Sequence, residues 1–194
     1  MDTENYCSLV CCMRLCLTKA LSIKRDALIP EKEDVKMDFM DVVRKRRSIR
    51  RYRPDPVPDE ILNQVLEAAR LAPSAGNRQP WHFIVVKDQA TKKIISERAA
   101  EAPVVIVGCT DTEVSARFHV VDLSIAFENL VLAATNFGLG TCWMGARAEE
   151  NIKAALGIPK HIAVVVVTPL GYPAETPGPK ERKSLSEIVH YERF

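Results

Sequence analysis

The sequence predicts one mixed domain of helices and strands over residues 37–194, preceded by an N-terminal extension over residues 1–36. The first observation is that amphipathic stretches with helical spacing alternate with short apolar runs that are typical of buried strands. The second is the polar stretch at residues 29–34, Ile-Pro-Glu-Lys-Glu-Asp, which is typical of a linker. A length of 194 residues with 47% hydrophobic and 27% charged residues fits a soluble globular protein.

The helices are predicted from apolar residues that recur every three to four positions and from the residues at their ends. Asp38 is placed to cap the first helix, Pro58 opens the second, and Gly157 stops the last. Two helices are predicted to begin at residues 38 and 58. Three more are predicted at residues 89–98, 120–137 and 149–156.

Two of these helices are informative through their apolar residues. In the first, Phe39, Val42 and Val43 share one side, as expected of an amphipathic helix. The helix at residues 120–137 is the longest and is apolar nearly all round. We therefore expect this long helix to lie in the core or at a subunit interface.

Four buried strands are predicted between these helices because short apolar runs are bounded by turn residues. They cover residues 81–86, 103–108, 141–144 and 161–167, and no internal repeat is present. Residues 1–36 lie outside this alternation and are expected to be disordered or marginally helical. Met37 and Met40 are both candidate starts of translation, and a chain that begins at Met37 would have 194 − 36 = 158 residues.

Charge and hydropathy restrict the class of partner. Lys and Arg number 27 against 25 Asp and Glu, so a formal charge of +2 gives no general affinity for nucleic acid or for an acidic membrane. No apolar run approaches the roughly 18 residues of a membrane-spanning helix. Asp2 and Glu4 stand where a secretory signal would carry basic residues, so we expect a cytoplasmic protein.

The cysteines are unevenly distributed. Cys7, Cys11, Cys12 and Cys16 lie in the extension, whereas the other two of the six lie far downstream. Their spacing, C-x3-C-C-x3-C, differs from the C-x-x-C pairs typical of metal or iron–sulfur sites. We therefore expect no metal site and interpret the four as reduced thiols of a tail or a marginal helix.

A basic stretch follows the first predicted helix. Seven of the ten residues at 44–53 are Arg or Lys. Three interpretations remain open: a nucleic-acid or localisation patch, a solvated helix end, or a site for one compact dianion. The third is favoured because arginine side chains and the Ser48 hydroxyl suit phosphate oxygens, and because the rest of the chain supplies no matching basic face.

Two further stretches have the composition of a binding site. In the loop at residues 71–81, Asn77 and Gln79 stand near Trp81, which suits a flat heterocycle with a hydrogen-bonding edge, although such loops are also common connectors. The stretch at 138–145 fails the dinucleotide pattern G-x-G-x-x-G and follows a helix instead of a strand. Its glycines Gly140 and Gly145 permit close approach of the backbone to another group.

Four motifs in order resemble the nitroreductase family of FMN-dependent oxidoreductases. They are RRSIRRY at 46–52, LAPSAGNRQPWHFIVV at 71–86, GLGTCWMG at 138–145 and RKSLSEIVHYE at 182–192. The resemblance covers residues 37–194 and leaves residues 1–36 outside. It implies an α+β fold with a central mixed sheet flanked by helices, and an intertwined homodimer with one FMN in each of two clefts at the subunit interface.

The same resemblance implies a set of flavin contacts. Arg50 is expected to face the N1 and O2 side of the flavin ring, Asn77 the pyrimidine edge, and the Gly145 amide N5. The phosphate and ribityl chain are assigned to Arg46, Ser48 and Arg182. The complete set is Arg46, Arg47, Ser48, Arg50, Ser74, Asn77, Gln79, Met144, Gly145 and Arg182.

The expected activity is transfer of hydride from NADH or NADPH, through flavin N5, to a nitroaromatic, a quinone or a similar flat small molecule. No catalytic acid is needed, because the flavin carries the chemistry. Only a short stretch at residues 111–118 separates the second predicted strand from the long helix, so the segment that covers the substrate in larger relatives is reduced. The alternative is a flavin-binding carrier or sensor without significant turnover.

Overall fold

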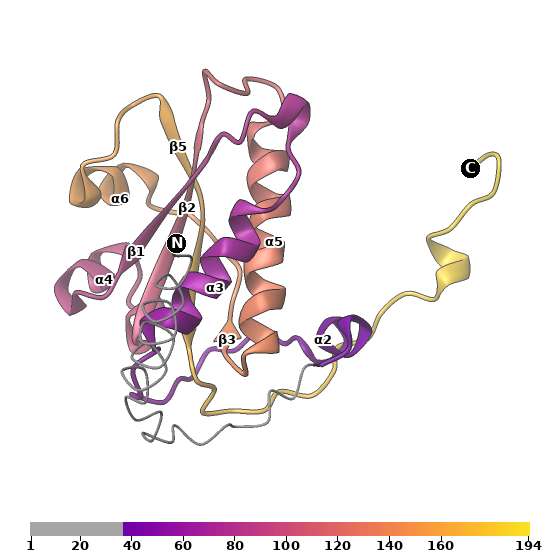
Figure 1. The fold of residues 1–194 in the computed structure, drawn as a ribbon, viewed down its shortest axis with the longest axis horizontal. Helices are drawn as coiled ribbons and strands as arrows, with labels where there is room; N and C mark the ends of the chain where they lie inside the picture. Colours follow the sequence, from indigo (N-terminus) through magenta and orange to yellow (C-terminus); the bar gives the residue numbers. More distant parts are fainter. Residues whose placement is uncertain (1–36) are drawn as a thin grey trace, which may run out of the picture. The chain divides into compact units, whose positions relative to one another are not determined.

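The computed structural model describes residues 37–194, which form an α+β domain (Figure 1). The predicted N-terminal extension and its four cysteines lie outside the described residues. Among the described residues, no helix has the length and apolar character needed to span a membrane. The elements are α2 (Phe39–Lys45), α3 (Asp59–Arg70), β1 (Trp81–Val86), α4 (Gln89–Ile95), β2 (Val104–Asp111), α5 (His119–Asn136), β3 (Gly140–Thr141), β4 (Met144–Gly145), α6 (Glu149–Leu156) and β5 (Ile162–Gly171), with 3-10 turns at Ala75–Asn77, Ala99–Glu101 and Leu185–Glu187.

The sheet has the strand order β1-β2-β5-β3, and β4 also pairs with β5. Each of these ladders is antiparallel. The sequence predicts a mixed sheet, but within the described residues the parallel component is limited to an isolated bridge between Ser48 and Thr141. The sheet is therefore antiparallel, with one short parallel contact at its β3 edge.

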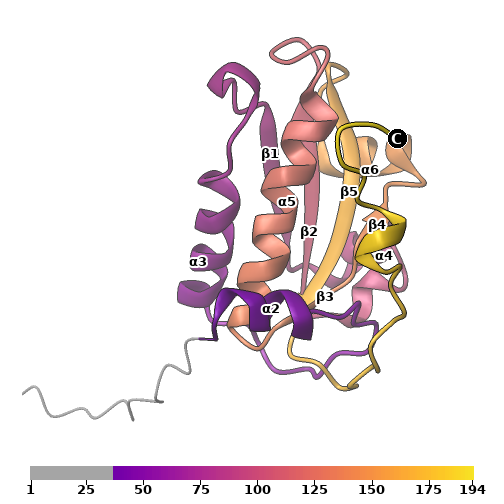
Figure 2. The same ribbon diagram turned by 90° about the vertical axis from the view of Figure 1, so that its right-hand side faces the viewer.

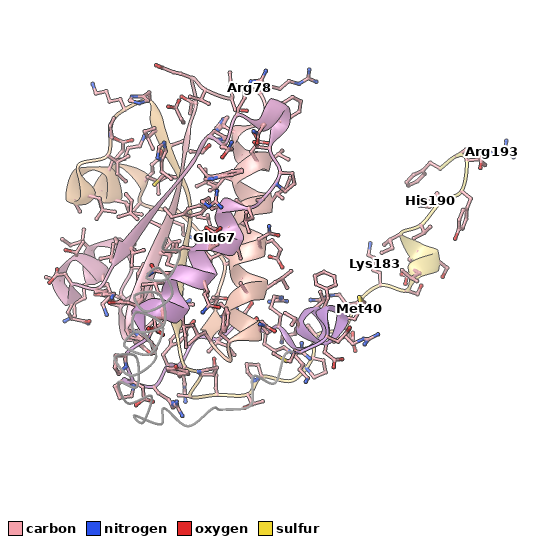
Figure 3. The ribbon with its side chains drawn as sticks, viewed as in Figure 1. Met40, Glu67, Arg78, Lys183, His190 and Arg193 are labelled. Carbon is pink, nitrogen blue, oxygen red and sulfur yellow. The ribbon has the colours of Figure 1, made fainter. Side chains whose placement is uncertain are left out.

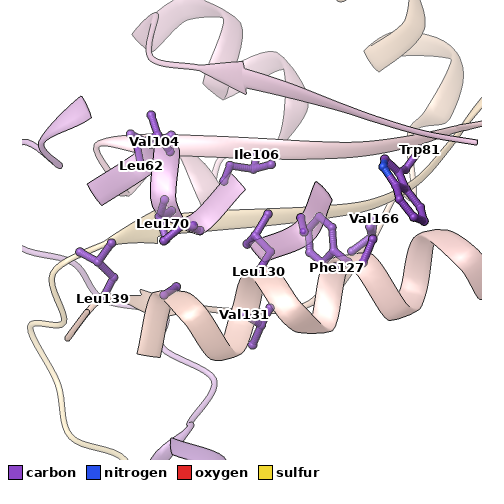
Figure 4. Packing of buried hydrophobic residues seen from close by; sticks show 14 of the residues in the cluster. Leu62, Trp81, Val104, Ile106, Phe127, Leu130, Val131, Leu139, Val166 and Leu170 are labelled. Atoms are coloured by element: carbon purple, nitrogen blue, oxygen red, sulfur yellow. The ribbon is translucent and has the colours of Figure 1, made fainter. Parts of the chain in front are cut away.

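Strand β2 is buried on both sides and divides the core in two. Alternate side chains of a strand point to opposite faces, so Val104 and Ile106 pack with α3 and α5, whereas Val105 and Val107 pack with α4 and α6. Figure 4 shows the first of these clusters, in which Phe127 of α5 lies against the sheet. Helices α3 and α5 thus cover one face of the sheet, and α4 and α6 cover the other (Figure 2).

The predicted helix ends agree with the structure where a local signal exists. The Asp38 carboxylate accepts the amide hydrogen of Met40 at 2.9 Å and caps α2. Helix α3 begins directly after Pro58. Gly157 ends α6 with φ +65°, a left-handed conformation that favours glycine. Helix α4 is shorter than predicted, because the backbone adopts an extended conformation at Ser96.

The strand predicted at residues 141–144 is divided in two. Thr141 pairs with Leu170, the pairing resumes at Met144 with Val167, and Pro169 lies opposite the interruption. A proline has no amide hydrogen for the ladder. At the interruption, the Cys142 amide donates to the Thr168 hydroxyl at 3.0 Å, and that hydroxyl donates to the Pro169 carbonyl at 3.0 Å.

Two helices keep apolar side chains exposed in the single chain. In α2 only Val42 is buried, and Phe39 is 66% exposed. In α5, Leu123 and Phe127 are fully buried, but Val121 is 53% exposed. The apolar surface predicted around the long helix is therefore only partly covered by its own chain.

The packing beside Gly108 in β2 gives a prediction. A Cβ atom at this position would lie 2.6 Å from Val166 Cγ1 and 3.0 Å from the Phe127 ring, so Gly108→Ala is expected to destabilise the fold by about 1–3 kcal/mol. Urea unfolding measures this change. Gly178→Ala is the matched control, since no atom lies within 4 Å of its Cβ position. Equal stability of the two variants would contradict this packing.

Candidate functional site

The arginine segment, residues 46–53, begins where α2 ends. The Arg47 guanidinium donates to the carbonyl oxygens of Arg44 at 2.6 Å and Arg46 at 2.8 Å. These contacts satisfy backbone oxygens at the helix end, where a cation is also favourable to the helix dipole. The family resemblance places Arg47 among the flavin contacts, whereas in the structure its guanidinium is hydrogen-bonded to the end of the preceding helix.

Beyond the helix, the arginine segment lies between β3 and the residues that follow β5. The Ile49 amide donates to the Thr141 carbonyl at 2.8 Å, and the Arg53 amide donates to the Tyr172 carbonyl at 2.9 Å. Gly140 permits this arrangement, because a Cβ atom there would lie 2.7 Å from Ile49 Cγ1. The close approach predicted at Gly140 is thus made by the arginine segment itself.

Glu175 completes the attachment of the arginine segment. Its Oε1 atom accepts the amide hydrogens of Arg50 at 2.6 Å and Arg51 at 3.2 Å. The Ala174 amide donates to the Arg51 carbonyl at 3.0 Å. The backbone at Arg50 and Arg51 is therefore fixed by residues more than 120 positions away in the sequence.

A cavity of about 830 Å³ opens beside this segment. Its walls come from the arginine segment, β4, the end of α4 and the start of α6. Three predicted flavin contacts, Arg50, Met144 and Gly145, line it together. The charged residues that line it are Arg50, Arg51, Arg98, Glu101, Arg147 and Glu175.

Four of these charged residues, Arg98, Glu101, Arg147 and Glu175, were not identified by the sequence analysis. None of them belongs to a motif with a chemical spacing. Arg98 and Glu101 lie at one 3-10 turn, Arg147 lies between β4 and α6, and Glu175 follows β5. Glu175 lies a few residues before the predicted motif at 182–192, and its role is visible only through its contact with the arginine segment.

Tyr52 shows that opposite charges act in this region. Its hydroxyl donates to the Ile49 carbonyl. Burial raises the pKa of Tyr52 well above its usual value; the Cys142 and Glu175 side chains raise the pKa further, and Arg50 opposes them. Tyr52 therefore stays a neutral hydrogen-bond donor at physiological pH.

The second predicted group of contacts lies in the loop between α3 and β1. The Ser74 hydroxyl accepts the Gln79 amide hydrogen at 2.9 Å, and the Gln79 side-chain amide donates to Asn77 Oδ1 at 3.2 Å. Asn77 and Gln79 have positive φ values of 54° and 48°, which are uncommon outside glycine. Both side chains are exposed, as binding residues on a shaped loop would be.

The loop is attached to the start of α5. The Asp122 carboxylate is buried and accepts the Ala75 amide hydrogen at 2.9 Å and the Ser115 hydroxyl hydrogen at 3.0 Å. The arginine segment, by contrast, lies against β3, which follows the end of α5. Since α5 has 18 residues, its two ends are about 27 Å apart.

A single chain therefore does not assemble all the predicted contacts. Ser74, Asn77 and Gln79 do not line the cavity that contains Arg50. In Figure 3, Arg78 of the loop and Met40 of α2 lie toward opposite ends of the domain. Arg182 lies in the exposed C-terminal segment, where its guanidinium donates to the Glu181 carbonyl at 2.9 Å.

A second cavity of about 500 Å³ lies elsewhere, and none of the predicted site residues lines it. His82, Asp111 and His161 stand around it, with His161 Nε2 at 4.0 Å from Asp111 Oδ2. Cys109 is fully buried, which raises the pKa of its thiol to about 11. Within residues 37–194, no three His, Cys, Asp or Glu side chains are grouped to hold a metal ion.

The fold and the arginine-lined cavity define an α+β protein with an anion-compatible site at the edge of its sheet. Comparison with protein families matches residues 43–109 and 89–172 to the nitroreductase family. A Methanothermobacter thermautotrophicus protein named NADH dehydrogenase/NAD(P)H nitroreductase is 40% identical over 171 residues, which cover 82% of this chain and 89% of that protein. The chain therefore belongs to the nitroreductase family.

Solved structures agree with this assignment. A NADH dehydrogenase/NAD(P)H nitroreductase of Parabacteroides distasonis has a TM-score of 0.76 at 31% identity, over 80% of this chain and 98% of that one. An FMN-dependent nitroreductase of Clostridium difficile has a TM-score of 0.72 at 31% identity, over 80% and 99%. The predicted family, oxidoreductase class and α+β nitroreductase-like fold are confirmed.

The attachment of the loop by Asp122 gives a prediction. Asp122→Ala leaves the Ala75 amide without its acceptor, so we expect a stability loss of about 1–3 kcal/mol and faster hydrogen exchange at Ala75. Asp122→Asn retains an acceptor oxygen and is expected to keep most of the protection. Unchanged exchange at Ala75 in Asp122→Ala would show that the loop is held by other contacts.

Proposed function

We propose that the protein is an FMN-dependent oxidoreductase that uses NADH or NADPH to reduce a nitroaromatic, a quinone or a similar flat acceptor. The observation that carries the proposal is the meeting of Arg50 with Met144 and Gly145 in one cavity of a nitroreductase-family fold. The names of the relatives, NAD(P)H nitroreductase and FMN-dependent nitroreductase, support the same donor and cofactor. When bound, FMN would take two electrons and a proton from the donor as hydride and pass electrons to the acceptor.

The residues of the cavity fit this cofactor. A Cβ atom at Gly145 would meet nothing within 4 Å, so its backbone is open to a flat group. Arg50 supplies a permanent cation on the same cavity. We assign the Gly145 amide to flavin N5 and the Arg50 guanidinium to the N1 and O2 side, where a cation stabilises the negative charge gained on reduction.

The remaining contacts are proposed from the family motifs. Arg46, Ser48 and Arg182 would hold the phosphate or ribityl chain, because arginine and hydroxyl donors suit a dianion. Arg47 would have to leave the helix carbonyls to join them. Every motif used lies within residues 37–194, which we propose as the FMN-binding domain.

A homodimer would bring the separated contacts together. If two copies pair α5 in opposite directions about a two-fold axis, the loop of one copy reaches the arginine segment of the other. The exposed apolar side chains of α5 and α2, including Val121, Ile125 and Phe39, give such an interface a surface to bury. We therefore propose that Ser74, Asn77 and Gln79 act on the cavity of the partner subunit.

Reconstitution with FMN followed by rapid mixing with NADH or NADPH tests the function. Bleaching of the flavin absorbance, and its return when a quinone or nitroaromatic is added, is the expected result. A protein that cannot bind FMN would refute the proposal. Bound flavin that neither nucleotide reduces would instead favour the alternative, a carrier or sensor.

The dimer proposal predicts that Ile125→Glu prevents association, because it places a charge on the exposed apolar side of α5. Sedimentation should then change from dimer to monomer, with weaker FMN binding. Ile94→Glu is the matched control: Ile94 is also exposed but lies on α4, which covers the other face of the sheet. A native protein that sediments as a flavin-loaded monomer at micromolar concentration would contradict the proposal.

Substitutions of Arg46 and Arg50 are predicted to have different effects on the bound flavin. Arg46→Ala removes a charge-assisted phosphate contact, so FMN affinity should fall by about tenfold to a hundredfold, and saturating FMN should largely restore the rate. Arg50→Ala removes the cation beside the reduced ring, so the midpoint potential should fall even at saturation. Titration with FMN and potentiometry distinguish the two. Identical behaviour would show that Arg50 is wrongly assigned.

A further inference from the structure

Glu175 occupies a position that the proposed flavin contacts do not explain. The amides on either side of its contact donate to main-chain carbonyls: Ile49 to Thr141 and Arg53 to Tyr172. The Arg50 and Arg51 amides instead donate to one carboxylate oxygen, at 2.6 and 3.2 Å. Hydrogen bonds to a carboxylate are stronger than those to a neutral acceptor. Glu175 therefore fixes the part of the arginine segment that carries the cavity cation.

The contact to Arg50 is made through the backbone and leaves its side chain available. Among residues 37–194, no ion pair within 4.0 Å joins Glu175 to the Arg50 guanidinium. The guanidinium makes one long contact, 3.4 Å, to the Ser48 carbonyl. Glu175 can thus hold Arg50 in place without neutralising it by direct pairing.

Glu175 is nevertheless close enough to influence the electrostatic potential in the cavity that Arg50 lines. Both Glu175 and Arg50 line the cavity, and the two act on the Tyr52 hydroxyl in opposite directions. A carboxylate close to a reduced flavin disfavours the negative charge that Arg50 favours. The two side chains therefore have opposing effects on the same electron-accepting site.

We propose that Glu175 is a positioning residue that orients Arg50 toward the flavin and moderates the cation's effect on the flavin potential. The proposal rests on the proposed FMN function. It separates two roles of one side chain: the acceptor oxygen fixes the backbone, and the negative charge lowers the potential. Replacement by glutamine removes the second role and preserves an oxygen for the first, whereas replacement by alanine removes both.

The experiment compares Glu175→Gln and Glu175→Ala with the native full-length protein. FMN dissociation constants, the midpoint potential of the FMN-saturated protein and the melting temperature are measured. Glu175→Gln is expected to bind FMN within about twofold of the native protein and to show a raised potential. Glu175→Ala is expected to lose about tenfold in FMN affinity, because two amides lose their acceptor.

Glu60→Gln and Glu60→Ala are the matched controls, since Glu60 is exposed at the start of α3 and does not line the cavity. They should leave affinity and potential unchanged. If Glu175→Ala does not fold, as its melting curve would show, the potential of Glu175→Gln decides. A native potential in Glu175→Gln would overturn the moderating role, and native FMN affinity in a folded Glu175→Ala would overturn the positioning role.

These outcomes are separate from failure of the proposed function. A native protein that binds no FMN refutes the function itself. A native protein that binds FMN, together with Glu175 variants that keep both its affinity and its potential, refutes only the inference about Glu175.

Discussion

Strand β5 forms hydrogen bonds along both of its edges, and these bonds hold the other strands of the sheet in place. One edge carries β2, and the other carries β3 and β4. The residues that follow β5 hold the arginine segment by hydrogen bonds at Tyr172, Ala174 and Glu175. Because these contacts all converge on β5 and the residues that follow it, the positions of the sheet edge, of Gly145 and of Arg50 are set relative to one strand.

The candidate site lies where this pairing is interrupted. Pro169, which has no amide hydrogen to donate to a ladder, lies opposite the gap between β3 and β4. Within the interruption, the Trp143 ring packs against Phe127, with ring centroids 5.0 Å apart at an angle of 76°. Met144 packs against the core cluster between the sheet and helices α4 and α6, and together with Gly145 it also borders the cavity. Gly145 thus lies shortly after the interruption, with no atom within 4 Å of its Cβ position and its backbone at the cavity wall.

Helix α5 separates the two groups of candidate contacts and also supplies a reason to join them. Its buried side carries Leu123, Phe127 and Leu130, which fix it to the sheet. Its other side leaves Val121 and Ile125 in contact with solvent in the single chain. Covering that side with a second copy would bury apolar area. It would also bring the loop of one copy close to the arginine segment of the other.

Features that depend on neighbouring residues could be predicted from the sequence. The Asp38 cap, the start of α3 after Pro58 and the stop at Gly157 are local signals, and each is found in the structure. The four ordered motifs likewise identified the family, which the comparisons confirm. The roles assigned to individual residues in those motifs stay predictions.

Three features could not be predicted from the sequence and are visible only in the folded chain. They are the antiparallel order of the sheet, the division of the predicted strand opposite Pro169, and the cavity that joins Arg50 to Gly145. The folded chain also shows Glu175 hydrogen-bonded to the arginine segment, 125 residues from Arg50. The physical reason is the same in each case. Contacts between residues far apart in the chain have no periodicity and no fixed spacing, so they are defined by packing and hydrogen bonding in the folded protein.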